Sequence, residues 1–236
     1  MKAKWDVGVV IPARNEEKLL PRCLESVLTA KASVERGASV SVVVVCDSSS
    51  DGTSRIAKKM LASQGIVLEV DAGVVGVARS VGSSHLLRRC NGPLSRCWIA
   101  NTDADCIVPE DWLVKQVQLA ERGIHAVAGV VRVDSFVEHG PEVVQRFQSS
   151  YVIRPDGSHP HVHGANLGCR ADRYVRAGGW KPLKTAEDHD LWNRLATTGA
   201  RRCSTSWLEV ETSGRRVGRA PNGFAEALAA HNETAA

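Results

Sequence analysis

The sequence lacks the features that mark several large classes of protein. No apolar run approaches the roughly 20 residues that a helix needs to cross a bilayer, and there are no internal repeats or low-complexity linkers. The first residues, MKAKWDVGVVIPARNEE, hold only a short apolar run followed by charge, which argues against a signal peptide. A net charge of +4 on 236 residues is too small to indicate a nucleic-acid-binding protein.

The cysteines lack a recognisable pattern as well. Seven are present, and no two have the CxxC spacing of zinc fingers or redox motifs. An odd number without such pairs argues against a disulfide framework. We therefore expect reduced cysteines and a cytoplasmic protein, with a peripheral position at a membrane left open.

What the sequence does contain is an alternation of apolar runs and helical patterns in its first half. The apolar, β-branched runs that read as strands cover residues 7–12, 39–46, 66–70, 97–100 and 125–133. Helical patterns separate them, and the last of these is expected to open at Pro109. This order predicts βαβ units in a Rossmann-like, mostly parallel sheet. No GxGxxG or GxxxxGK[ST] follows a strand, so dinucleotide-binding and P-loop fingerprints are excluded.

The alternation stops after about residue 133. Residues 135–168 read as irregular and are rich in His, Gly and Pro. Helical patterns then cover 171–177, 187–198 and 223–231, and a strand-like run covers 206–212. We expect this half to form a cap on the sheet and not a separately folding domain.

Four polar clusters follow the predicted strands, at residues 12–17, 46–53, 76–80 and 101–105. Ligands of open α/β sheets bind beyond the carboxyl ends of the strands, so four clusters at one edge predict a site. The last cluster carries Asp103 and Asp105 directly after an apolar run. Taken alone, this pair of aspartates is also compatible with a capped turn instead of a metal site, because turns favour Asp.

In combination these segments resemble the family 2 glycosyltransferases of the GT-A fold. The matching segments are VVIPARNEE, CDSSSDGT, GVARSVG, the DxD at Asp103–Asp105, and AEDHDLWNRL, together spanning about residues 6–200. Cys46 and Ser48 depart from the usual Asp and Gly of the second segment. The resemblance implies a single GT-A domain over 1–236, with a nucleotide-sugar-binding half (about 1–133) and an acceptor-binding half (about 134–236).

The resemblance also implies a metal-dependent donor site. Asp105 would be the main ligand of Mg²⁺ or Mn²⁺, and Asp103 would meet the ribose or the water shell of the metal, because hard divalent ions prefer carboxylate oxygen. The donor nucleotide would contact Pro12, Ala13, Arg14, Glu16, Asp47, Arg79, Asp103, Arg215 and Arg216. The residues alone also allow other interpretations. Arg14 and Glu16 could form a surface ion pair, and Asp47 could be a turn carboxylate. Arg79 could be a solvated helix residue, and the late basic loop could be solvated.

Inverting transfer needs a base that takes the proton of the acceptor hydroxyl. The family places this base in an "ED" pair at the head of a helix, which makes Asp188 the base and Glu187 its neighbour. Carboxylates also suit a helix N-terminus through its dipole alone, and Asp190 is an alternative base.

Residues near the transferred sugar and the acceptor are assigned by resemblance as His163, Gly164, Ala165, Asn166 and Trp180. Zinc binding by His159, His161 and His163 is an alternative because they are spaced two apart, and Trp180 is equally a core residue. His231 is a further candidate as a third metal ligand.

The sequence thus predicts an inverting, non-processive glycosyltransferase, since the QxxRW motif and membrane helices of processive synthases are absent. Its expected donor is a UDP- or GDP-sugar, and its acceptor is a small molecule or a lipid-linked one. Alternatives are a nucleotidyltransferase and a non-catalytic nucleotide-sugar-binding subunit. No nucleic-acid partner is expected, and a homodimer is left open.

Overall fold

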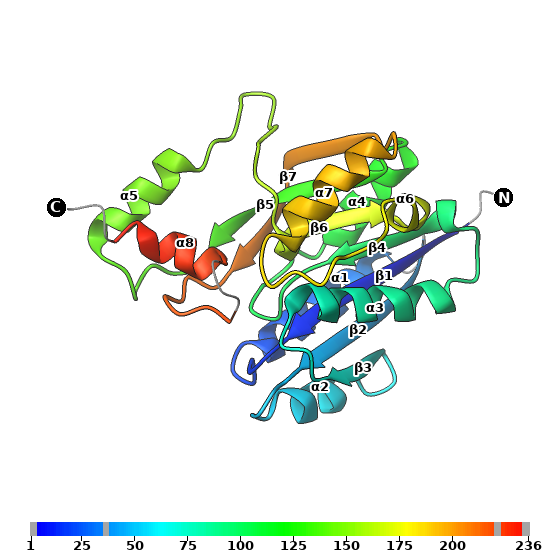
Figure 1. The fold of residues 1–236 in the computed structure, drawn as a ribbon, viewed down its shortest axis with the longest axis horizontal. Coiled ribbons are helices and arrows are strands. Elements are labelled where there is room, and N and C mark those ends of the chain that lie inside the picture. The colour runs from blue at the N-terminus through cyan, green and yellow to red at the C-terminus, as the bar shows by residue number, and fades with distance from the viewer. Residues whose placement is uncertain (1–3, 35–37, 220–222, 233–236) are drawn as a thin grey trace.

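A computed structural model describes residues 4–34, 38–219 and 223–232, which form a seven-stranded sheet with helices on both faces (Figure 1). The strands are β1 (Trp5–Ala13), β2 (Ala38–Asp47), β3 (Gly65–Val70), β4 (Cys97–Asn101), β5 (Ala126–Val133), β6 (Leu167–Arg170) and β7 (Arg202–Thr212). The helices are α1 (Leu20–Val34), α2 (Thr53–Leu61), α3 (Val75–Arg89), α4 (Trp112–Glu121), α5 (Pro141–Ser150), α6 (Ala171–Arg176), α7 (Glu187–Thr197) and α8 (Phe224–Ala230). Two 3₁₀ turns cover Leu94–Arg96 and Gly164–Asn166.

The sheet is mostly parallel, as the sequence predicts. Its strand order is β3-β2-β1-β4-β6-β5-β7, and β6 runs antiparallel to both of its neighbours. Two clusters of buried side chains lie on opposite faces of the sheet, one under α1, α2 and α4 and the other under α3, α6 and α7. The central strands are therefore covered on both faces, which explains the continuous valine run in β2. None of the described helices is both long and apolar enough to cross a membrane.

Two elements lie in the segment that the sequence analysis expects to be irregular. Strand β6 has only four residues, and Gly168 within it has no room for a side chain, because a Cβ would lie 2.1 Å from Gln116 Oε1. Helix α5 begins at Pro141 and packs with α8 through Phe136, Phe147 and Phe224. Strand β6 is too short to show a period, whereas α5 is amphipathic but lies in a segment rich in His, Gly and Pro, so the expectation of an irregular segment is wrong for both elements.

The helix after β4 begins later than expected. Residues 109–111 form a turn in which the Trp112 N–H donates to the Pro109 carbonyl, and α4 starts at Trp112.

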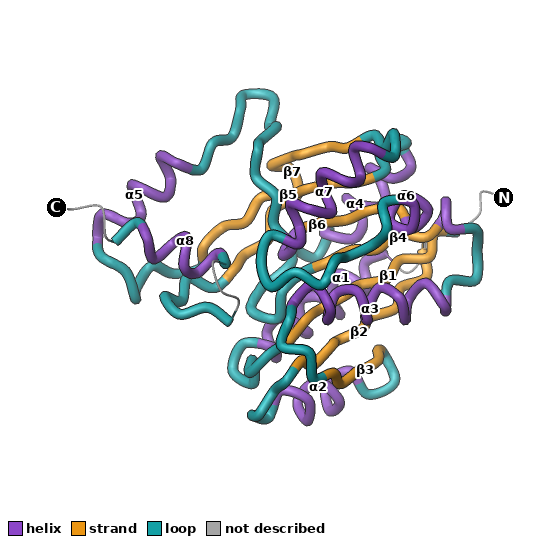
Figure 2. The backbone as a smooth tube through the Cα atoms, in the orientation of Figure 1, coloured by secondary structure: helices purple, strands orange, loops and turns teal. Residues whose placement is uncertain are grey.

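The carboxyl ends of the first five strands, by contrast, lie within one residue of the predicted positions. The carboxyl ends of β1 and β2 lie at one end of the sheet, where Figure 2 shows loops gathered beside α8.

The pairing of β5 with β7 is interrupted. Gly129 pairs with Thr205, but the next residue, Val130, pairs with Glu209, so β7 carries extra residues at this point. The buried side chain of Asn166 fills the irregularity, donating from Nδ2 to the carbonyls of Val130 and Leu208 at 2.9 Å each. A Cβ on Gly129 would lie 2.2 Å from this nitrogen, so glycine is required here.

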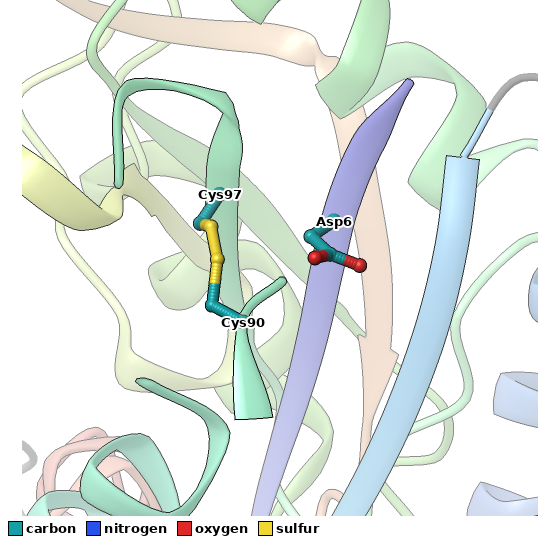
Figure 3. A group of neighbouring side chains, drawn as sticks. All are labelled: Asp6, Cys90 and Cys97. Atoms are coloured by element: carbon teal, nitrogen blue, oxygen red, sulfur yellow. A yellow bond between two sulfur atoms is a disulfide. The ribbon is translucent and has the colours of Figure 1, made fainter. Parts of the chain in front are cut away.

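The cysteine expectation is wrong for one pair. Cys90, at the end of α3, and Cys97, at the start of β4, are joined by a disulfide beside Asp6 of β1 (Figure 3). The two residues are only seven apart, so the bond closes a local loop and is not part of a wider framework. Odd cysteine counts do not exclude such a local pair, because the fold sets which thiols meet.

Candidate active site

A cavity of about 470 Å³ opens at the carboxyl ends of β1, β2 and β4. All four predicted polar clusters contribute to its lining. Residues 162–165 and 184–189 line it as well, together with some of the residues in 212–219 and 223–227. Residues from both halves of the chain therefore meet at the sheet edge that the sequence predicts.

The first two polar clusters hold each other in place. The Ser50 N–H donates to Asn15 Oδ1, the Glu16 N–H donates to Thr53 Oγ1, and the Gly52 N–H donates to Glu17 Oε2, all at 2.8–2.9 Å. Glu17 is thereby used to fix the loop. Glu16 instead turns its carboxylate into the cavity, where it is buried.

Asp105 lies in the cavity under the late basic loop. Its carboxylate is 3.0 Å from Arg215 Nη2, and Arg215 Nη1 donates to Glu16 Oε1 at 2.7 Å. Burial raises the pKa of both carboxyl groups, and the Arg215 charge opposes this rise. Arg219 adds a hydrogen bond to the Asn15 carbonyl at 2.9 Å. The loop is thus docked over these carboxylates at Arg215, whereas the Arg219 side chain remains exposed.

Asp103 belongs to a second ionic group. The fully buried guanidinium of Arg79 lies 2.6 Å from Asp103 Oδ1 and 3.1 Å from Glu187 Oε1. Desolvation alone would lower the pKa of Arg79, but the two carboxylates outweigh it and raise that pKa. Arg79 also has one buried nitrogen, Nη1, with no hydrogen-bond partner among the described residues. This nitrogen has almost no exposed surface, so it is not itself open to a ligand in the cavity.

Asp47 lines the cavity but already accepts three backbone hydrogen bonds. The N–H groups of Ala72, Gly73 and Val74 donate to its two oxygens at 2.8–2.9 Å. The carboxylate therefore shapes the loop between β3 and α3. Oδ2 accepts only one of these bonds, which leaves it a lone pair for a ligand.

Asp188 and Asp190 differ clearly in their surroundings. Asp188 lines the cavity, where its Oδ2 accepts the Gly164 N–H at 2.8 Å and its Oδ1 accepts the His189 N–H at 2.7 Å. Asp190 does not line the cavity and forms an ion pair with Arg194, one turn later on α7. Burial raises the pKa of the neighbouring Glu187, which is held by Arg79. Among the ion pairs of the described residues, Glu187 and Asp190 each have an arginine partner, whereas Asp188 has none.

The sequence-predicted sugar residues separate into two groups. His163, Gly164 and Ala165 line the cavity, together with the donor-side Pro12, Ala13 and Arg14. Asn166 and Trp180 do not. Asn166 has no exposed surface and also accepts the Trp112 indole N–H at 3.0 Å, and the buried Trp180 ring lies 5.3 Å from the Arg79 guanidinium carbon. Both side chains pack behind the residues that line the cavity and support them.

Arg216 and His231 also lie off the cavity. The Arg216 N–H donates to Glu138, and His231 lines a shallow surface depression with Gln145 and Arg146. The three closely spaced histidines stack in a row, with ring centroids 5.8 and 6.1 Å apart, and do not form a metal-ligand group among the described residues.

Sequence reasoning missed several residues of the site. Arg22, on α1, donates to the Asp105 carbonyl and pairs with Asp134, which fixes the backbone of the DxD. Lys184 and His189 line the cavity on either side of the ED pair. Lys184 and His189 could have been predicted from their closeness to that motif in the sequence. Arg22 could not, because only the tertiary fold brings α1 to the DxD.

The donor atoms at the DxD fit a hard divalent cation. The carboxylates of Asp103 and Asp105 and the Cys106 thiol all lie within 4.8 Å of one another. Mg²⁺ and Mn²⁺ are hard ions that prefer carboxylate oxygen to thiol sulfur, which leaves the two carboxylates as the ligands that this group offers them.

Residues 8–175, which are most of the chain, match the family described as glycosyl transferase family 2. The chain belongs to glycosyl transferase family 2. It is 25% identical over 201 residues to the putative glycosyltransferase EpsE of Bacillus subtilis (strain 168), covering 83% of this chain and 68% of that protein.

A second relative is the undecaprenyl-phosphate 4-deoxy-4-formamido-L-arabinose transferase of Shewanella sediminis (strain HAW-EB3). It is 27% identical over 220 residues, covering 92% of this chain and 62% of the relative. The chain thus spans about two thirds of the length of these two family members.

Among solved structures, the fold is similar to the mannosyltransferase PcManGT from Pyrobaculum calidifontis in complex with GDP-Man and Mn²⁺. The TM-score is 0.64 at 19% identity, covering 98% of this chain and 70% of that one. The predicted GT-A fold is confirmed.

The position of Asn166 gives a prediction about stability. Asn166→Ala should leave the Trp112 indole N–H and the carbonyls of Val130 and Leu208 buried without partners, at about 1–3 kcal/mol each. We expect the free energy of unfolding to fall by at least about 3 kcal/mol in urea titrations. The exposed Asn193→Ala, on α7, is the control and should change it by less than about 0.5 kcal/mol. A fully stable Asn166→Ala with impaired sugar binding would show instead that Asn166 is a ligand residue.

Proposed function

We propose that the chain transfers one sugar, with inversion, from a UDP- or GDP-sugar to a hydroxyl group of an acceptor. The observation that carries this proposal is that one cavity contains both the DxD carboxylates, at the end of β4, and Asp188, at the head of α7. A donor-binding group and a base for the acceptor are both needed for transfer, and they come from different parts of the chain. Family membership supports the reaction class.

In this proposal Asp188 acts on the acceptor. Its carboxylate removes the proton of the acceptor hydroxyl as that oxygen bonds to the anomeric carbon, while the bond from this carbon to the diphosphate breaks. The hydrogen bonds from Gly164 and His189 orient the carboxylate and leave each oxygen a further lone pair. Asp188 keeps the proton, and the nucleoside diphosphate leaves with the bonding electrons.

The departing diphosphate gains negative charge, which Arg79 and Arg215 are placed to meet. Asp103 and Asp105 would hold Mg²⁺ or Mn²⁺, and the bound ion would supply positive charge to the diphosphate oxygens. In the donor-free structure Arg215 compensates Asp105 and Glu16. Guanidinium groups bind phosphate oxygens in the same forked geometry as carboxylates, so Arg215 can change partners when a diphosphate enters.

We further propose a division of labour within the single domain. Residues up to about 133 bind the nucleotide, through the loops after β1, β2 and β4 and the start of α3. Residues from about 134 bind the acceptor, and Arg215 is the part of that half that also reaches the donor. The acceptor is a small molecule or a lipid-linked one, the second supported by the name of the Shewanella relative.

A panel of nucleotide-sugars tests the proposal directly. Each donor is added with Mn²⁺ and the melting temperature is measured, because a tight ligand stabilises the fold by mass action. We expect one UDP- or GDP-sugar to stabilise the protein more than its free nucleoside. If no nucleotide-sugar does so with either metal, the proposed donor class is wrong.

The metal assignment gives the next prediction. Asp105→Asn should weaken Mn²⁺ binding, measured by calorimetry without donor, by more than the about 10–100-fold typical of losing an outer-shell partner. The fold should stay intact, because the change removes a desolvated charge. Asp111→Asn, in the exposed turn before α4, is the matched control and should bind Mn²⁺ normally. Unaltered Mn²⁺ affinity in Asp105→Asn would remove Asp105 from the metal site.

Arg215 and Arg216 should behave differently although they are adjacent. Arg215→Ala is expected to weaken binding of a nucleoside diphosphate about tenfold or more at saturating Mn²⁺, since a charge-assisted hydrogen bond contributes about 1.5–3 kcal/mol. Binding of the bare nucleoside should hardly change. Arg216→Ala should leave both affinities within about twofold, because its N–H, and not its side chain, makes the contact that holds it. Equal losses for nucleoside and nucleoside diphosphate in Arg215→Ala would argue against a phosphate contact.

Asp188→Asn should separate chemistry from donor binding. Loss of a general base is typically worth on the order of 10²–10⁴-fold in rate, and we expect a fall of that size in kcat with little change in donor Kd. Stability should drop by about 1 kcal/mol, because an amide cannot accept from both backbone N–H groups. Asp190→Asn is the control and should remain active. An inactive Asp190→Asn with an active Asp188→Asn would move the base by two residues.

A further inference from the structure

A phenol–imidazole pair lies behind one wall of the cavity. Tyr151, the residue directly after α5, places its hydroxyl oxygen 3.0 Å from His163 Nε2. The Val131 N–H donates to the same phenolic oxygen at 3.0 Å. The ring of His161 stacks on the Tyr151 ring, with centroids 3.9 Å apart and planes 4° from parallel. The tyrosine is therefore fixed in position from several sides, and no sequence motif marked it.

Counting protons fixes the direction of the hydrogen bond between Tyr151 and His163. The phenol has one proton, and its oxygen already accepts from Val131. Among the described residues, the acceptor within reach of that proton is His163 Nε2. If Nε2 carried a proton instead, the phenolic proton would be left without an acceptor, which is unfavourable in a partly buried group. A neutral imidazole with a bare Nε2 carries its proton on Nδ1.

Both groups stay uncharged near neutral pH. Burial, and then the nearby His161, lowers the pKa of His163 to about 3. Burial raises the pKa of Tyr151 to about 12. The imidazole is therefore a neutral donor at Nδ1 and not a cation, and the phenol remains a donor to Nε2.

The other side of the imidazole faces the ligand space. His163 lines the cavity and directly precedes Gly164, whose N–H holds Asp188. Nδ1 has no hydrogen-bond partner among the described residues, and it is not one of their sealed, unpaired nitrogen atoms. An N–H group of fixed direction is thus open to a ligand beside the proposed base.

We propose that the Nδ1–H of His163 donates a hydrogen bond to a hydroxyl oxygen of the donor sugar or of the acceptor, and that Tyr151 is the positioning residue that keeps the proton on Nδ1. The inference rests on the proposed sugar transfer for the identity of the ligand. A neutral donor suits a hydroxyl group, whereas the arginines of the same cavity suit phosphate. His163 would therefore select for an oxygen substituent on one sugar position.

The tautomer can be measured without turnover. Nitrogen-15 NMR of the imidazoles, at neutral pH, distinguishes a protonated ring nitrogen from a bare one. We expect His163 to show a protonated Nδ1 in the wild type and a shift of the proton toward Nε2 in Tyr151→Phe, which keeps the stacked ring but removes the hydroxyl. His161→Asn, which removes the stacking partner outside the cavity, should leave the His163 tautomer unchanged. A wild-type His163 protonated at Nε2 overturns the inference.

Two substitutions of His163 then test the donor function. The amide nitrogen of Gln lies near the position of Nε2, and that of Asn lies near Nδ1. His163→Gln should lower kcat/KM about tenfold, the loss of one good hydrogen bond, and His163→Asn should recover much of this loss. Tyr151→Phe should lower kcat/KM by a smaller factor. Equal activities of the Gln and Asn variants would contradict a donor at Nδ1.

Binding measurements identify which hydroxyl is involved and separate this inference from the proposed function. If His163→Gln weakens binding of the nucleotide-sugar but not of the nucleoside diphosphate, the hydroxyl belongs to the donor sugar. If both affinities hold and the acceptor KM rises, it belongs to the acceptor. If neither affinity nor acceptor KM changes, His163 has no ligand and the inference fails. Wild-type protein that binds nucleotide-sugars but transfers nothing would contradict the transferase proposal, while the NMR and binding results would still decide the role of His163.

Discussion

The arrangement of the site depends on one buried cation. Arg79, on the first turns of α3, bridges Asp103 and Glu187 with a guanidinium that has almost no exposed surface. Burying a charge is costly unless it is paired, so both carboxylates have to be present where they are. Gly164 leaves room for the group, because a Cβ there would lie 2.3 Å from Arg79 Nη2. Arg79 thus joins the end of β4 to the head of α7, and these two elements carry the DxD and Asp188.

A second group of balanced charges lies around Arg215. Burial, and then the nearby Asp105 charge, raises the pKa of Glu16, and Arg215, from a loop nearly two hundred residues away, pairs with both carboxylates and opposes this rise. Under the proposed function, an ion or a diphosphate that enters would exchange partners with this arginine and would not meet bare carboxylates. The net gain on binding would then be the difference between two sets of ionic contacts, which would favour a ligand carrying both a metal and phosphates over either alone.

Sequence reasoning was most successful where the pattern is repeated or chemically unusual. The valine run of β2, the βα alternation and the strand-end clusters with Asp103 and Asp105 predicted the fold class and the edge that holds the cavity. It did not reveal β6 or the bulge in β7, because these depend on contacts of Gly168 and Asn166 with distant strands. The family resemblance assigned Asn166 to the sugar site together with Gly164 and Ala165. Its side chain lies instead in the gap left by the bulge and does not line the cavity.

The same bulge links β5 and β7 to the segment that carries His163 and Gly164. Asn166 holds Val130 and Leu208, and the next residue of β5, Val131, donates its N–H to Tyr151. One short stretch of β5 therefore supports both the turn that ends at Asn166 and the tyrosine that fixes His163. Because His163, Gly164 and Asn166 lie within four positions, displacement of this stretch would move the imidazole and the N–H that orients Asp188 together. The hydrogen bonds at this strand irregularity thus support the part of the cavity wall that holds His163 and Asp188.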